Sequence, residues 1–243
     1  MLDGLKDLWR MARVDGWIFT NATFVAAEVE VDAAAAARWL PGGLRLASPA
    51  TATLFVAHYP ETSFGSVYNE AGLFLDVRRG GRAAVHCPWM VVDDDVALIL
   101  GREALGYPKK MAALSLSLES DDIEATVERR GVRLLELRGK VGRREESPPP
   151  MLARRACNVW GTMGLSLQRL LSFTPREQIL EAREVEMQIE VRESARDPLH
   201  ELKIGRVLRA YRYRLNIGGA GVPLPVRAVS PLFMMQRWAL RYS

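Results

Sequence analysis

The sequence predicts an α+β fold that is mostly antiparallel β: a closed, barrel-like or cone-like sheet that encloses an apolar cavity, with a few peripheral helices. Seven segments between residues 24 and 141 are rich in β formers or alternate between apolar and polar residues. Helix start and stop signals interrupt this series only twice. An antiparallel sheet of this size can close on itself and hold an apolar interior.

The predicted strands of the first half are bounded by turn residues or by helix signals. The segment ERRGVRLLEL predicts a hairpin around Gly131, because glycine is favoured in tight turns. The seven segments are FVAAEVEV (24–31), TATLFVAHY (51–59), SVYNEAGLFLDV (66–77), AAVHCPWMVV (83–92), AALSLSLE (112–119), IEATVER (123–129) and VRLLELRGKV (132–141).

Two helices are predicted among these strands. The first begins at Asp32, runs through AAAAARWL and ends at Pro41, because aspartate caps helix N-termini and proline stops a helix. The second is capped by the acidic run at residues 93–95 and ends at Gly106. The acidic residues at its N-terminus also suit the helix dipole.

The C-terminal half begins with an ambiguous segment, TPREQILEAREVEMQIEVRES. Its first residues imitate a capped helix start, whereas residues 185–191 alternate as in a strand. We predict a short turn and then a long strand. After Gly205 we predict another strand (RVLRAYRYRLNI), a tight loop at GGAG (218–221) and a closing helix (SPLFMMQRWALRY). The GGAG segment lacks the spacing of a dinucleotide-binding fingerprint.

The length of 243 residues suits a single domain, 1–243, because no repeat or low-complexity linker divides the chain. The proline cluster SPPP (147–150) is interpreted as a loop within that domain. Residues 1–13 can form an amphipathic helix that docks on the body of the protein or on a sister subunit.

Composition excludes several classes of protein. The net charge is +4, but the arginines are interspersed with acidic residues, so we expect no nucleic-acid partner. No secretory signal and no run of membrane-spanning length is present, which indicates a cytoplasmic protein without a membrane partner. Cys87 and Cys157 lack the spacing of a metal or disulfide motif, and the histidines form no ligand pattern, so we expect no metal and no cofactor.

Two adjacent lysines in GREALGYPKK follow a helix stop and a proline within a stretch that is poor in charge. An ammonium group with an ordinary pKa near 10.4 loses its charge more readily when it is desolvated, and a neutral amine attacks carbonyls. Neighbouring residues of an extended chain face opposite sides, so only one lysine can enter a pocket. The alternative is that both are solvated surface residues at a turn.

The segment VDDDVALILGREALGYPKKMA resembles the signature of the acetoacetate decarboxylase family, and weaker similarity extends from about Trp17 to the C-terminus. The resemblance implies that Lys109 is the Schiff-base nucleophile, and that Glu70 of SVYNEAG is a second catalytic residue. Lys110 is then a supporting neighbour, and we expect desolvation of Lys109 to matter more than repulsion from Lys110. Family members form large homo-oligomers, so a homo-oligomer is expected.

The sequence also departs from this family. Ala22 and Phe55 stand where the family carries an arginine and a second glutamate, which predicts a more apolar pocket. We expect Phe55, Met90 and Tyr107 to line or support the pocket, and Arg102 to brace the lysine loop.

These residues lead to three hypotheses. The first is a Schiff-base lyase that acts on a small or medium β-keto or α-keto acid, with decarboxylation of a β-keto acid through a lysine iminium and an enamine as the leading reaction. The second is a Schiff-base aldolase or dehydratase acting on keto acids, which the replacements Ala22 and Phe55 motivate. The third is a non-catalytic barrel that binds a hydrophobic ligand. The lysine alone does not choose among them, because an iminium can weaken C–C and C–H bonds alike.

Overall fold

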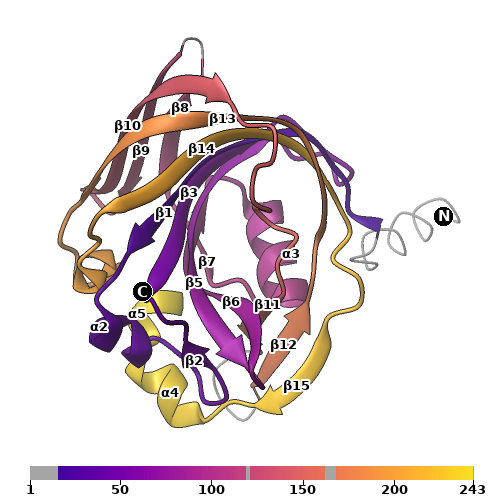
Figure 1. Cartoon of the computed structure of the whole chain (residues 1–243). Helices are drawn as coiled ribbons and strands as arrows, with labels where there is room; N and C mark the ends of the chain where they lie inside the picture. The colour runs from indigo at the N-terminus through magenta and orange to yellow at the C-terminus, as the bar shows by residue number, and fades with distance from the viewer. Residues whose placement is uncertain (1–15, 119–120, 162–167, 243) are drawn as a thin grey trace, which may run out of the picture.

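The computed structural model describes residues 16–118, 121–161 and 168–242 (Figure 1). Strands dominate these residues and form one mixed, mainly antiparallel sheet. The strands are β1 (Phe19–Glu30), β2 (Arg45–Leu46), β3 (Thr51–Tyr59), β4 (Glu61–Thr62), β5 (Tyr68–Arg79), β6 (Arg82–Val92), β7 (Lys109–Met111), β8 (Ala113–Ser117), β9 (Asp122–Arg129), β10 (Val132–Arg144), β11 (Ala156–Trp160), β12 (Arg169–Phe173), β13 (Arg176–Val191), β14 (Val207–Gly218) and β15 (Leu224–Ala228). The helices are α2 (Ala33–Arg38), α3 (Asp95–Leu105), α4 (Pro231–Gln236), α5 (Trp238–Arg241) and the 3-10 helix η2 (Leu199–Leu202).

The sheet is open, so the predicted closed barrel is wrong. Its strands pair in the order β15-β12-β11-β6-β5-β3-β1-β14-β13-β10-β9-β8, and among the described residues β15 and β8 do not pair with each other. The end that carries β8 instead folds back and contacts β3 and β5. Closure requires the two edge strands to meet. Here apolar side chains of β9 and β10 pack on the sheet instead, and Figure 1 shows the sheet curling around α3.

The long elements agree with the sequence predictions. Strand β3 has the predicted bounds, and β13 follows a short turn as one long strand. At the hairpin between β9 and β10, Arg130 and Gly131 both adopt positive φ, at 54° and 76°, as the favoured two-residue hairpin turn requires. The predicted closing helix is divided into α4 and α5. The predicted N-terminal helix lies outside the described residues.

Both predicted helices begin at an aspartate cap. The side chain of Asp32 accepts a hydrogen bond from the Ala35 amide at 2.8 Å, and that of Asp94 accepts one from the Ala97 amide at 2.7 Å. Helix α3 ends at Gly106, which adopts the left-handed conformation with φ of 67°. The sequence did not predict the short strands β2, β4, β7, β11, β12 and β15.

The central strands bury both of their faces. Alternate residues such as Val25, Leu54 and Leu73 belong to one core, which the β8–β10 end of the sheet covers. The opposite face carries large aromatic residues, including Phe24 and Phe74, and belongs to a second core that α3 covers. Burial on both sides explains why these strands contain long apolar runs, and it places an aromatic wall next to α3.

Candidate active site

A pocket lies between this aromatic face, α3 and the loop that follows β14, and its empty space, including the part open to solvent, is about 670 Å³. Its lining is aromatic and aliphatic, with one lysine and one glutamate among the described residues. The lining residues are Trp17, Phe19, Tyr59, Phe64, Tyr68, Glu70, Phe74, Met90, Ala97, Leu100, Gly101, Leu105, Tyr107, Lys109, Leu152, Pro175, Ile217, Gly218, Gly219 and Ala220.

Lys109 reaches this pocket because the chain becomes extended directly after α3. Gly106 ends the helix, and the next residues form β7, which pairs in parallel with β6 so that Lys109 lies beside Met90. The guanidinium of Arg102 donates to the carbonyl of Lys109 at 2.9 Å and to the carbonyl of Arg241 at 3.1 Å. Arg102 therefore braces the lysine strand against the C-terminal helix and does not line the pocket.

The ammonium nitrogen of Lys109 forms a buried ion pair with Glu70. Nζ lies 2.6 Å from Oε2 of Glu70, and the two side chains are 7% and 6% exposed. The hydroxyl of Tyr59 donates to the other carboxylate oxygen, Oε1, at 3.2 Å. Oε2 accepts no aligned hydrogen bond from the described residues beyond this charge contact.

Three tyrosines surround this pair as neutral groups. The ring of Tyr68 lies with its centroid 5.4 Å from the Lys109 nitrogen and stacks on Tyr59 at 4.5 Å. Burial raises the pKa of the Tyr59 and Tyr68 hydroxyls well above the ordinary value, and the nearby charge of Glu70 raises both further. Burial also raises the pKa of Tyr107. The phenols thus stay protonated at neutral pH and add no charge to the pocket.

Gly101 leaves the space that the Lys109 side chain occupies along α3. A methyl group at Gly101 would lie 2.5 Å from Cε and 2.7 Å from Cδ of Lys109, closer than carbon atoms approach. The sequence analysis did not single out Gly101, although a glycine inside a helix is itself a signal of close packing.

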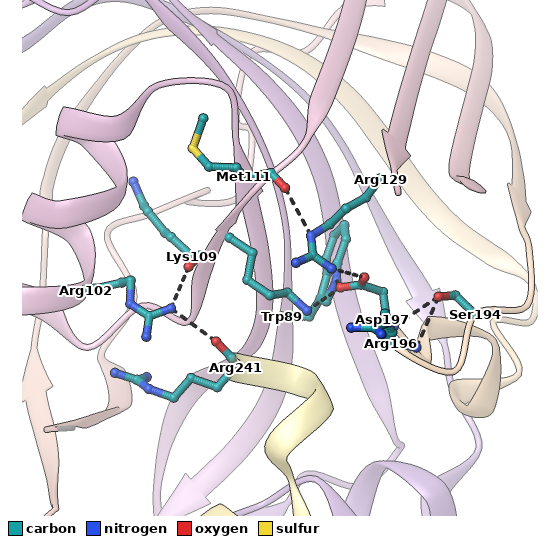
Figure 2. Close-up of polar contacts among 10 residues, drawn as sticks. Trp89, Arg102, Lys109, Met111, Arg129, Ser194, Arg196, Asp197 and Arg241 are labelled. Atoms are coloured by element: carbon teal, nitrogen blue, oxygen red, sulfur yellow. Dashed lines mark hydrogen bonds and ion pairs between the residues drawn. The ribbon is translucent and has the colours of Figure 1, made fainter. Parts of the chain in front are cut away.

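Lys110 points to the opposite side of β7 from Lys109, and it is buried. Its nitrogen forms an ion pair with Oδ1 of Asp197, which also accepts from the indole of Trp89 at 3.0 Å. Arg129 donates to Oδ2 of Asp197 at 2.8 Å. Figure 2 shows the Lys109 side chain directed away from Asp197 and Arg129. Burial lowers the pKa of Lys110 to about 8, and Asp197 opposes this effect.

The other residues that the sequence predicted for the pocket lie at different depths relative to it. Met90 and Tyr107 line the pocket. Phe55 is fully buried beneath it, with its ring 5.1 Å from Phe74 and 5.5 Å from Phe24, and does not line it. Ala22 is also fully buried in this aromatic core.

The sequence reasoning also missed the Asp197 cluster. Its members come from β6, β7, β9 and the segment before η2, so no local motif marked them.

Among the described residues no group of histidine, cysteine and carboxylate side chains is arranged to hold a metal ion. Within the same residues, no helix combines the length and the hydropathy needed to cross a bilayer.

The structure combines an open, curled sheet with an apolar pocket in which a lysine and a glutamate are paired. This combination of fold and site defines a class of proteins. The sequence profile of acetoacetate decarboxylase matches residues 8–221 of this chain. The chain therefore belongs to the acetoacetate decarboxylase family.

Similar proteins support this assignment. The acetoacetate decarboxylase of Acidiphilium cryptum is 30% identical over 116 residues, which span 48% of this chain and 47% of that protein, so the match covers about half of the relative's length. The solved acetoacetate decarboxylase of Legionella pneumophila has the same fold, with a TM-score of 0.78, 16% identity and 87% of each chain covered.

A second solved structure is MppR, an enduracididine biosynthesis enzyme complexed with the condensation product of pyruvate and imidazole 4-carboxaldehyde. It superposes with a TM-score of 0.75 at 17% identity, covering 88% of this chain and 89% of that one. The fold is therefore shared by an acetoacetate decarboxylase and by a protein named as an enduracididine biosynthesis enzyme.

Proposed function

We propose that this protein is a Schiff-base-forming lyase that decarboxylates a β-keto acid through a lysine iminium and an enamine. The contact that carries the proposal is the 2.6 Å approach of Lys109 to Glu70 in an apolar pocket. A lysine that is desolvated in a hydrophobic pocket is suited to attack a carbonyl, and acetoacetate decarboxylase is itself an established example of a lysine activated by its surroundings.

The reaction begins when the ammonium of Lys109 passes a proton to Oε2 of Glu70, 2.6 Å away, which leaves Lys109 as the free amine. Its nitrogen adds to the ketone carbon, and loss of water with uptake of one proton gives an iminium ion. The bond between the α-carbon and the carboxylate then breaks, CO2 leaves, and the electron pair forms an enamine. Protonation of the α-carbon and addition of water release a ketone and restore the amine of Lys109.

Glu70 has two roles in this scheme. Its carboxylate stabilises the iminium cation, because the pair lies in a site of low dielectric where opposite charges attract strongly. Its Oε2 atom can also carry the protons that move during dehydration and enamine protonation. Tyr59 holds Oε1 and so fixes the orientation of the carboxylate.

A Schiff-base aldolase or dehydratase is the second candidate. Two observations favour it: Ala22 and Phe55 are buried apolar residues at positions where family resemblance implied charge, and the structurally similar MppR is complexed with a condensation product. The same iminium would then activate a C–H bond at the α-carbon. A non-catalytic barrel is no longer a suitable description, because the sheet is open, but non-catalytic binding of an apolar ligand stays a third hypothesis.

Trapping with borohydride tests the covalent step. Wild-type protein is incubated with β-keto and α-keto acids, reduced, digested and examined by mass spectrometry. We expect an adduct on Lys109 that is absent in Lys109→Ala. Lys203→Ala provides the matched control, since Lys203 is an exposed lysine on another part of the chain. Absence of an adduct with every keto acid would refute the covalent mechanism.

The reaction is then assigned by its products. Release of CO2 supports the lyase, whereas appearance of a conjugated enone absorbance without CO2 supports the aldolase or dehydratase.

The homo-oligomer and the cytoplasmic location stay predictions. Analytical ultracentrifugation of the purified chain tests the first, and fractionation of the producing cells tests the second.

A further inference from the structure

The lining residues that the structure describes include a single pair of opposite charges. Lys109 and Glu70 are the only lysine, arginine, histidine, aspartate or glutamate side chains among the described lining residues. They lie 2.6 Å apart, and the positive charge of an iminium on Lys109 would be matched by Glu70 in the same way. The described lining thus offers no further cation to a ligand.

Because the charges of Lys109 and Glu70 neutralise each other, the pocket affects the carboxylate that leaves and any second carboxylate of a bound keto acid differently. The carboxylate that leaves as CO2 becomes neutral during the reaction, so an apolar surrounding favours its loss. A second carboxylate would stay charged, desolvated and without a cationic partner, and Glu70 would repel it. The pocket therefore discriminates against dicarboxylic substrates.

The remainder of the lining suits an apolar group. The ring centroids of Phe74 and Tyr107 lie 6.4 Å apart, and those of Phe19 and Phe64 lie 5.7 Å apart. The empty space of about 670 Å³ includes the part of the pocket that is open to solvent, so the aromatic and aliphatic character of the lining, and not the volume, favours an apolar group.

We propose that the substrate is a monocarboxylic β-keto acid whose acyl group is a medium-length alkyl chain or an aryl ring. The inference rests on the proposed function for the identity of the reaction. The preference for an apolar acyl group is a property of the pocket and can be measured by binding alone. Each additional buried methylene is expected to raise affinity about fourfold.

Calorimetric titration of the wild-type protein compares three carbonyl compounds without turnover. Methyl pentyl ketone carries the apolar chain, acetone lacks it, and levulinate replaces part of it with a carboxylate. We expect methyl pentyl ketone to bind at least about tenfold more tightly than either of the others. Equal or tighter binding of acetone or levulinate, or no binding of any of the three, would overturn the inference.

A paired substitution tests the charge argument directly. Leu100 is a half-buried lining residue on α3, so a long polar side chain at this position can extend into the pocket mouth. Leu100→Arg should raise the affinity for levulinate relative to methyl pentyl ketone by about tenfold, because a guanidinium pairs with a carboxylate. Leu100→Gln should not. An unchanged ratio in Leu100→Arg contradicts the proposed basis of the selectivity.

Measurements of turnover distinguish a failure of this inference from a failure of the proposed function. With benzoylacetate, butyrylacetate, acetoacetate and oxaloacetate as substrates, we expect kcat/KM for CO2 release to be highest for the first two. A higher value for acetoacetate or oxaloacetate would overturn the inference while leaving the lyase intact. Tight binding of methyl pentyl ketone without CO2 release or a borohydride adduct would instead support the apolar ligand class and refute the lyase.

Discussion

A methyl group at Gly101 is expected to separate the reactivity of Lys109 from the stability of the fold. In Gly101→Ala, the new carbon would lie 2.5 Å from Cε, 2.7 Å from Cδ and 3.0 Å from Nζ of Lys109. Ordinary contacts of this kind begin at 3.4 Å, so the end of the lysine side chain must move by roughly 1 Å. That movement also changes the 2.6 Å contact with Glu70.

Gly101→Ala is expected to have a small effect on the free energy of unfolding and a large effect on the reaction rate. Alanine is favoured over glycine inside a helix by about 1 kcal/mol, whereas overpacking a core destabilises by about 1 to 3 kcal/mol. The clashing atoms belong to a flexible side chain, so we expect the free energy of unfolding to change by no more than about 1 kcal/mol. A displacement of about 1 Å at a reacting group lowers the rate by about a hundredfold.

The assay combines chemical denaturation with the rate of borohydride trapping and kcat/KM for benzoylacetate. Gly42→Ala is the control, because a methyl group at Gly42 meets no atom within 4 Å. We expect Gly101→Ala to lose about a hundredfold in both rates while the denaturation midpoint is nearly unchanged. Trapping at the wild-type rate, or a loss of activity that simply follows a large loss of stability, would refute the reasoning.

Three further predictions concern buried titratable groups. Glu70→Gln keeps the shape of the side chain but removes the charge 2.6 Å from Lys109, so kcat/KM should fall by about 10² to 10³, and a change below threefold would contradict its role. Lys110→Met leaves Asp197 with one cationic partner fewer, so urea denaturation should show a loss of about 3 kcal/mol, whereas an unchanged midpoint would mean that the pair is not stabilising. Burial lowers the pKa of His86 from 6.5 to about 4, so the unfolded chain binds a proton first as the pH falls. The stability of wild type relative to His86→Phe should therefore decrease by up to about 3 kcal/mol between pH 6.5 and 4, and a constant difference would exclude this linkage.

Much of the secondary structure could be predicted because its signals are local. Asp32 and Asp94 cap the helices through side-chain hydrogen bonds to amides three residues later, and Gly131 supplies the positive φ of a hairpin. The alternation at the end of β13 reflects the burial of one face of the strand, where Val185 and Met187 are buried while Glu186 and Gln188 are exposed. The short strands β7, β11 and β15 carry too few residues to show a period, and only their partners in the sheet define them.

The candidate site was predicted only in part, for a related reason. The opposite orientation of the two lysines follows from extended backbone, in which neighbouring side chains face opposite sides. The sequence could not show that Phe55 lies beneath the pocket lining, because both faces of β3 are buried and both carry apolar residues. Asp197 lies 87 residues from Lys110, so nothing in the local sequence indicated that they pair.

The sequence by itself determined the strand-rich composition of the fold, the caps of α2 and α3, and the placement of Lys109 at the end of a helix in an apolar stretch. These properties depend on residues within a few positions of one another. The tertiary structure alone decided that the sheet stays open, that Glu70 and Gly101 surround the Lys109 side chain, and that Lys110 is buried in a second cluster. Each of these depends on which distant segments pack together, and packing is governed by the shape and burial of whole faces rather than by local periodicity.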